Sequence, residues 1–160
     1  MKEYIFKILD LIRNNQAVFI GLVGLCITYY FSRLTRKSES DKMLKDLFEG
    51  FNLRYDLLNN KLFDIVIDSK DNKAVGQTSE LNADQKKTLI DYFNLCAEEY
   101  FWFKRNRIDD KIWKSWKAGM DYWYNYDTIS QMWHEEVKTK NGKLSYYIEN
   151  GDEFFEDYNE

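Results

Sequence analysis

Basic and aromatic side chains alternate between Phe101 and Met120, and together they suit a phosphate-bearing ligand. The stretch contains six Lys or Arg residues against two acids, although acids outnumber bases in the whole chain. Guanidinium and ammonium groups bind phosphate oxygens, and aromatic rings stack on nucleobases. Arg105 and Arg107, beside a helix break, are the best placed for bidentate phosphate contacts. We therefore predict a nucleotide-binding site made of Trp102, Lys104, Arg105, Arg107, Lys111 and Lys114.

A second interpretation of the same stretch stays open. Large aromatic side chains are mostly buried in folded proteins, so each tryptophan taken singly is better explained as core. The lysines would then form a solvated face. The acidic segment Ser145–Glu160, which has no Lys or Arg, would be available to pair with them.

Few residues offer catalytic or metal-binding chemistry. His134 is the only histidine, and its place between a tryptophan and two glutamates is typical of a surface or structural residue on an amphipathic helix. Cys26 and Cys96 lie far apart in the chain, and with one histidine they supply neither a zinc site nor a disulfide framework. Glu98 and Glu99 are neighbours on one predicted helix and diverge by about 100°, so they do not form a catalytic pair. We expect no enzymatic activity, no cofactor and no metal.

An uncharged run from Asn14 to Ser32 is the most apolar part of the chain. A helix of this length spans about 28 Å, close to the hydrocarbon thickness of a bilayer. The aromatic residues 29–31 stand where an interfacial belt belongs. A buried core helix is the alternative, whereas a cleavable signal peptide is disfavoured because no small-x-small cleavage site follows. We predict a transmembrane helix over residues 14–33.

Cations gather more densely after this run than before it, which by the positive-inside rule places the C-terminal part in the cytoplasm. Residues 1–13 are predicted as an amphipathic segment at the opposite interface, with Ile5, Ile8, Leu9 and Ile12 toward lipid. The cations before the run are Lys2, Lys7 and Arg13, and those after it are Arg33, Arg36, Lys37, Lys42 and Lys45.

An apolar stripe follows the predicted span with the 4-3 spacing of three heptads, which predicts a helical stalk over residues 34–67. The stripe could pair with a second copy, giving a homo-oligomer, or it could pack onto the chain's own domain, and the spacing favours neither. Small residues at Ala17 and Gly21, and at Gly24 and Thr28, would let paired spans approach closely. The stripe consists of Leu44, Phe48, Phe51, Tyr55, Leu58, Leu62 and Ile65.

A loop over about 68–80 separates the stalk from a C-terminal domain, predicted over residues 78–160. Three helices with apolar stripes are expected there, and the residues after them would dock as a strand or a short helix. The first helix opens with a capping box of Asn82 and Gln85 and runs to about Phe103. The others open at Asp109 or Asp110 and at Asp127, the last ending near Asn141–Gly142. The predicted fold class is mainly α, with an N-terminal transmembrane helix, a stalk and a compact cytosolic helical domain.

The stretch Tyr92–Lys104, continuing through Ile108–Trp113 to Trp116, resembles a family of small, mostly uncharacterised bacterial proteins with a single membrane span. The order of one span and a short helical domain also resembles the membrane effectors of type III CRISPR systems. That second resemblance implies an oligomer in the bacterial inner membrane that binds a cyclic oligoadenylate, notably cyclic tetra-adenylate, and then disturbs the membrane. It rests on architecture and on the basic aromatic stretch, so it assigns no residue.

Three hypotheses follow from these patterns. The first is an antiviral defence effector that senses a cyclic oligonucleotide and forms a pore or disrupts the membrane. The second is a non-catalytic adaptor that tethers a protein partner to the membrane through an aromatic cytosolic domain. The third, a membrane-bound hydrolase or nuclease, is disfavoured by the single histidine and the unpaired carboxylates. A net charge of −4 argues against long DNA or RNA as the partner.

Overall fold

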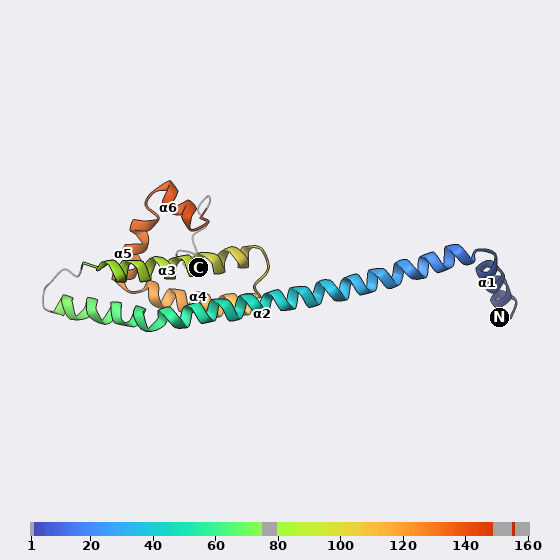
Figure 1. Ribbon diagram of the computed structural model, residues 1–160, viewed down its shortest axis with the longest axis horizontal. Helices are drawn as coiled ribbons and strands as arrows, with labels where there is room; N and C mark the ends of the chain where they lie inside the picture. The colour runs from blue at the N-terminus through green and yellow to red at the C-terminus, as the bar shows by residue number, and fades with distance from the viewer. Residues whose placement is uncertain (1, 75–79, 149–154, 156–160) are drawn as a thin grey trace. The chain divides into compact units, whose positions relative to one another are not determined.

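The computed structural model describes residues 2–74, 80–148 and 155, of which residues 2, 8, 9, 11, 12 and 71–74 are described by their backbone alone (Figure 1). Within these ranges the chain is almost entirely helical and holds no strand, which confirms the mainly α fold class. It divides into two compact units, residues 1–43 and residues 44–160, and we call the second the helical domain. The helices are α1 (Lys2–Asn14), α2 (Gln16–Ala74), α3 (Ala83–Lys104), α4 (Asp110–Tyr124), α5 (Asp127–Glu136) and α6 (Lys140–Ser145).

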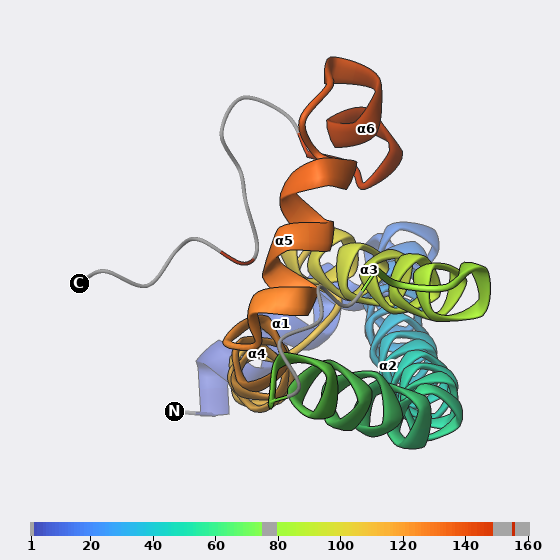
Figure 2. The ribbon, with the colours of Figure 1, turned by 90° about the vertical axis from the view of Figure 1, so that its left-hand side faces the viewer.

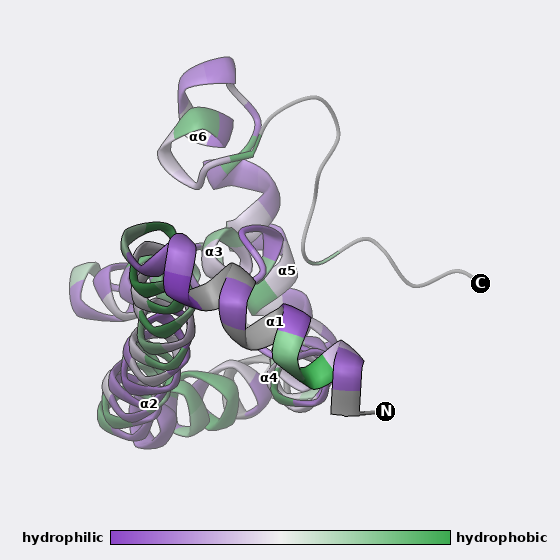
Figure 3. Ribbon diagram, turned by 90° about the vertical axis from the view of Figure 1, so that its right-hand side faces the viewer, coloured by the Kyte–Doolittle hydropathy of each residue, from purple (hydrophilic) through white to green (hydrophobic). Residues whose placement is uncertain are grey.

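The N-terminal unit consists of α1 and the first part of α2. By length and composition α2 could cross a membrane, and Figure 3 colours the ribbon by the hydropathy of each residue. The apolar window that qualifies α2 is not buried at all. The helix begins at Gln16, two residues after the predicted start of the span, because Asn14 ends α1. In the predicted amphipathic segment Ile5 is exposed, whereas the side chains of Ile8, Leu9 and Ile12 lie outside the described residues. The large apolar residues exposed along the run are Val18, Phe19, Ile20, Leu22, Val23, Leu25, Ile27, Tyr29, Tyr30 and Phe31.

The core of the helical domain forms where the second part of α2 meets α3, α4 and α5. Viewed end-on in Figure 2, the green part of α2, α3 and α4 surround a common centre, and α5 rises beside α3. Burial of this much apolar surface is the main favourable term in its folding. The largest fully buried side chains are Trp123, Trp133, Tyr92, Phe93, Leu62, Leu89, Leu95, Ile129 and Cys96.

The predicted stalk is part of this core. Phe51, Leu62 and Ile65 of the heptad stripe are 5%, 0% and 2% exposed, and Tyr55 and Leu58 pack against them. Of the two alternatives that the spacing left open, the structure therefore shows packing onto the chain's own domain. From Leu44 onward α2 belongs to the helical domain, so residues 34–67 do not form a separate stalk.

Aromatic partners from α4 explain why the stripe turns inward. The Trp116 ring lies 5.9 Å from the Phe48 ring, nearly parallel to it, and 5.6 Å from the Phe51 ring, edge to face. The Trp123 Nε1–H donates a 2.9 Å hydrogen bond to the Tyr55 hydroxyl. Such pairs add about 0.5–1.5 kcal/mol each beyond the area that they bury.

Local capping signals fix the starts of α3 and α4 as predicted. The Asn82 side chain accepts a 2.9 Å bond from the Gln85 N–H, and the Gln85 side chain accepts a 3.0 Å bond from the Asn82 N–H. Asp109 caps α4 by accepting from the Lys111 N–H at 2.8 Å. Each cap satisfies backbone donors that the first helical turn leaves unpaired.

The third predicted helix differs from expectation at both ends. Asp127 is the first residue of α5 rather than its cap, and Tyr126 precedes it without a side-chain cap. The helix also ends at Glu136, ahead of the predicted stop near Asn141–Gly142, because Thr139 starts a new helix. The Thr139 hydroxyl accepts from the Gly142 N–H at 3.0 Å and opens α6.

The predicted tail, which begins at Tyr146, follows the short helix α6, and its described residues form neither the strand nor the short helix that was expected. Tyr146, Ile148 and Phe155 are buried in the core, whereas Tyr147 is exposed. Phe154 lies outside the described residues.

We predict that Gly142→Ala destabilises the helical domain. A Cβ added there would lie 1.8 Å from the backbone oxygen of Glu136, so the turn between α5 and α6 would have to shift. The expected loss in free energy of unfolding is about 1–3 kcal/mol, measured by urea titration of the full chain in a neutral detergent. Gly50→Ala is the matched control, because nothing lies within 4 Å of a Cβ added there. It should gain about 0.5–1 kcal/mol, and equal effects of the two changes would refute the close contact.

Candidate functional site

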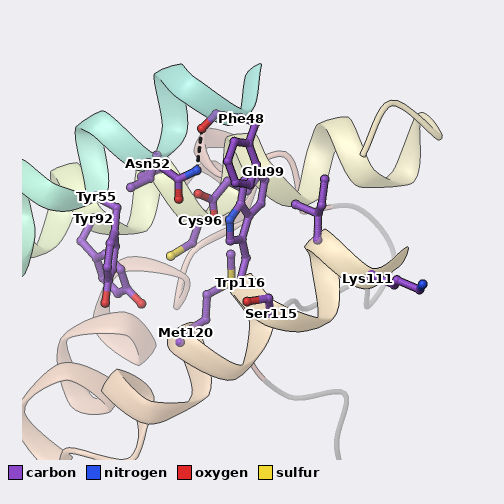
Figure 4. A pocket seen from close by; sticks show the side chains of 13 residues that line it. Phe48, Asn52, Tyr55, Tyr92, Cys96, Glu99, Lys111, Ser115, Trp116 and Met120 are labelled. Carbon is purple, nitrogen blue, oxygen red and sulfur yellow. Dashed lines mark hydrogen bonds between the residues drawn. The ribbon is translucent and has the colours of Figure 1, made fainter. Parts of the chain in front are cut away.

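A cavity of about 470 Å³ opens between α2, α3 and α4 within the helical domain (Figure 4). Its volume and its mixture of apolar walls with a few polar groups are typical of small-molecule sites. Each helix contributes residues at i, i+3 or i+4 and i+7, so each presents one face to the cavity. The lining is Phe48, Asn52 and Tyr55 from α2; Tyr92, Leu95, Cys96 and Glu99 from α3; and Lys111, Ile112, Ser115, Trp116, Gly119 and Met120 from α4.

Glu99 is the exceptional group in this wall. It is 6% exposed, and burial raises the pKa of its carboxyl to about 8, with Glu98 adding to the rise and Arg54 opposing it. The Arg54 guanidinium is itself occupied by Glu98, in a bidentate pair with bonds of 2.5 and 3.1 Å. No hydrogen bond from another described residue reaches Glu99. Its carboxyl is therefore mostly protonated at neutral pH.

Two other polar groups in the wall are neutral near pH 7. Burial raises the pKa of the Tyr92 hydroxyl and of the Cys96 thiol well above their usual ranges. The Tyr92 hydroxyl and the Cys96 thiol also interact with each other within this wall. The cavity wall thus combines aromatic surface with one titratable carboxyl.

The predicted nucleotide-binding residues lie around the connection from α3 to α4. Lys104 ends α3, Arg105 caps it, Arg107 lies in the connection, and Lys111 and Lys114 stand on the first turns of α4. All five are exposed, and we call them the basic corner. Trp102 is half-buried against the core instead. Lys117 is buried in an ion pair with Asp121, so it is not part of this surface.

The aromatic rings near the basic corner contact its cations or pack into the core. They do not form an open surface on which a base could stack. The Arg105 guanidinium lies 4.4 Å from the centre of the Phe101 ring, and the Lys104 ammonium lies 5.6 Å from the centre of the Tyr100 ring. Trp113 is buried and stacks on Phe103 at 4.6 Å. For this tryptophan, as for those at positions 123 and 133, the core interpretation holds.

His134 lies on the surface of α5, as predicted. Its ring is exposed, and its Nδ1–H donates a 2.6 Å hydrogen bond to the Ser130 carbonyl oxygen one turn earlier.

Glu99 is the functional candidate that the sequence analysis missed, because it was judged only as a partner for Glu98. A signal for it was present. Glu99 follows Tyr92 and Cys96 at i+7 and i+3, so it stands on the apolar stripe of α3. A lone acid on such a stripe lowers the stability of the fold, and this marks it as a candidate functional residue.

Comparisons with known protein families, with characterised proteins and with solved structures gave no match for this chain. Its function therefore has to be argued from the cavity, the basic corner and the apolar run of α2.

Glu99→Gln should stabilise the helical domain increasingly as pH rises. Below about pH 4.5 the carboxyl is protonated in both states; between there and about pH 8 only the unfolded chain ionises, which favours unfolding. Relative to the variant, the wild-type free energy of unfolding should fall across this window, by at most about 4 to 5 kcal/mol. Urea titrations of both chains at pH 5, 7 and 9 measure the difference. A difference that does not change with pH would contradict the buried, unpaired carboxyl.

Proposed function

We propose that this chain is a membrane-anchored antiviral defence effector of bacteria, with one span in the inner membrane and the helical domain in the cytoplasm. The support for anchoring is the apolar run of α2, whose large side chains are exposed, as between Ile20 at 72% and Leu25 at 69%. A core helix of a soluble protein would bury these residues, and lipid is the surrounding that satisfies an exposed run of this length.

The proposed ligand is a cyclic oligoadenylate, with cyclic tetra-adenylate the first to test. The observation that carries this is the basic corner. Arg105, Arg107, Lys111 and Lys114 are exposed, and no ion pair joins them to an acid within the described residues. On a chain of net charge −4, such a concentration of cations favours a compact polyanion. No catalytic step is proposed.

Coupling between ligand and membrane would run along α2, which contains the apolar run and packs against α3 and α4, the two helices that the basic corner connects. A single span encloses no channel, so pore formation or membrane disruption requires several copies. A ligand changes their arrangement only through its different affinity for the two arrangements. Binding and assembly are then linked, and each strengthens the other.

A specific observation also favours the adaptor as a second candidate. The outward face of α2 in the helical domain carries Leu53, Leu57 and Ile67, which are 63%, 67% and 54% exposed. An exposed apolar face of this kind is typical of a protein-binding surface. The adaptor would dock its partner on this aliphatic face, because most of the aromatic residues lie in the core.

Charge reversal in the basic corner should abolish ligand binding. The change is Arg105→Glu with Arg107→Glu, in the full chain in a neutral detergent, titrated with cyclic tetra-adenylate by calorimetry. Each lost contact to a charged group costs about 1.5–3 kcal/mol, so the double change should weaken binding by at least about 100-fold. Wild-type binding should also weaken with added salt, because neutralising phosphates releases counterions.

The matched control reverses two exposed lysines near the start of α3, the helix that Arg105 caps at its other end: Lys86→Glu with Lys87→Glu. This variant carries the same change in net charge and should bind as the wild type does. If both double variants bind equally, the basic corner is a solvated face. If the wild type binds none of the cyclic oligoadenylates, the adaptor becomes the better proposal.

A further inference from the structure

The cavity between α2, α3 and α4 is lined by groups that a polyanion does not need. We propose that it is a binding site for a small organic cation, with the Glu99 carboxylate as the counter-ion and Phe48, Tyr55 and Trp116 as its aromatic wall. The site shares only Lys111, at the outer end of its lining, with the basic corner, and it does not depend on the ligand proposed there.

The carboxyl supplies the first reason. Glu99 lines the cavity at 6% exposure, and no described donor bonds to it. The nearest guanidinium, that of Arg54, forms its bidentate pair with Glu98. A buried acid without a partner lowers the stability of the fold, and such a cost is most often retained where a ligand uses the group. A cation entering the cavity would supply the missing partner.

The aromatic wall supplies the second reason. Phe48 and Trp116 stack with ring centres 5.9 Å apart at an interplanar angle of 18°, and Tyr55 lies about two helical turns farther along α2 than Phe48. Ring faces attract ammonium groups, and the attraction grows where water is excluded. Phe48, Trp116 and Glu99 line the same cavity (Figure 4), so one ligand could contact both the carboxyl and the rings.

The positive groups around the cavity do not cancel this preference. Figure 4 shows the Lys111 ammonium directed away from Glu99, at the outer end of the lining. Lys117 is held by Asp121 and Arg54 by Glu98. A phosphate group, in contrast, would meet a carboxylate and apolar rings in the cavity. The titratable or charged groups packed around Glu99 are Arg54 and Tyr55 from α2, Tyr92, Cys96 and Glu98 from α3, and Lys111 and Lys117 from α4.

Binding must release a proton. In the empty cavity Glu99 holds its proton up to about pH 8, and a bound cation favours the carboxylate, so the proton passes to solvent. Affinity should therefore rise about tenfold per pH unit from pH 6 to 7 and level off above pH 8. A quaternary ammonium probe shows this dependence cleanly, because it has no proton of its own to lose.

The test uses the full chain in a neutral detergent and titrates it with benzyltrimethylammonium by calorimetry between pH 6 and pH 9. Repeating the titration at pH 7 in buffers of different ionisation enthalpy counts the protons released. We expect close to one proton per bound cation, and benzyl alcohol, an uncharged probe, should bind more weakly at pH 8 with no dependence on pH.

Glu99→Gln keeps the size of the side chain and removes its charge. It should weaken cation binding at pH 8 by at least about tenfold, remove the pH dependence and leave the weak binding of benzyl alcohol unchanged. Asp91→Asn is the matched control, because Asp91 is an exposed acid on the same helix outside the cavity, and it should bind as the wild type does.

Three results would overturn the proposal: no proton release, equal affinity for the cation and the alcohol at pH 8, or wild-type cation binding in Glu99→Gln. Circular dichroism of the variant, which we expect to be at least as stable as the wild type, separates a lost site from a lost fold. Failure here leaves cyclic tetra-adenylate binding at the basic corner unaffected, so the two proposals fail independently.

Discussion

Phe51, Leu62 and Ile65 of α2 leave water only by packing against α3 and α4, and the rest of the helical domain depends on that contact. It brings Trp116 and Trp123 onto α2, joins the Tyr55 hydroxyl to the Trp123 indole at 2.9 Å, and encloses the cavity between the three helices. Because the inner face of α2 is used in this way, its outer face in the helical domain keeps exposed leucines. The large apolar side chains of the run before residue 33 are exposed as well. The part of α2 in the helical domain is therefore buried on one face by that domain, whereas the apolar run needs an apolar surrounding that the domain does not supply.

The two charged features of the domain follow from different physics. At the basic corner the cations are exposed, so they retain their hydration and attract anions over a distance set by ionic strength. At Glu99 the carboxyl is removed from water, so its charge state depends on what enters the cavity. The basic corner suits the recruitment of a polyanion. Glu99 suits a small cationic ligand, whose charge would stabilise the carboxylate in place of water. Both lie within the unit formed by residues 44–160.

Sequence reasoning succeeded where a structure is determined locally. The capping box at Asn82 and the cap at Asp109 act within one helical turn, and both are found as predicted. The heptad stripe of α2 could not be resolved in advance, because a 4-3 pattern buries equally well against a partner or against its own chain. Contacts between residues distant in sequence, such as Tyr55 and Trp123, show that the stripe packs against its own chain. The burial of Glu99 also depends on contacts between helices that are distant in sequence, so it could not be predicted. The start of α6 at Thr139 was missed because the polar residues around it resemble the end of a helix.

We propose that α2 is covered by lipid at one end, whereas its own domain covers it at the other, and the two native cysteines report on both. Cys26 is exposed on the apolar run, whereas Cys96 is buried in the core with a raised thiol pKa. The direct measurement is the rate at which a charged, membrane-impermeant maleimide labels the full chain in proteoliposomes. We predict that neither thiol reacts until detergent and urea are added, after which both react. Rapid labelling of Cys26 in intact proteoliposomes would place the run in water, and rapid labelling of Cys96 would show that the domain does not pack as described; either result would contradict the account.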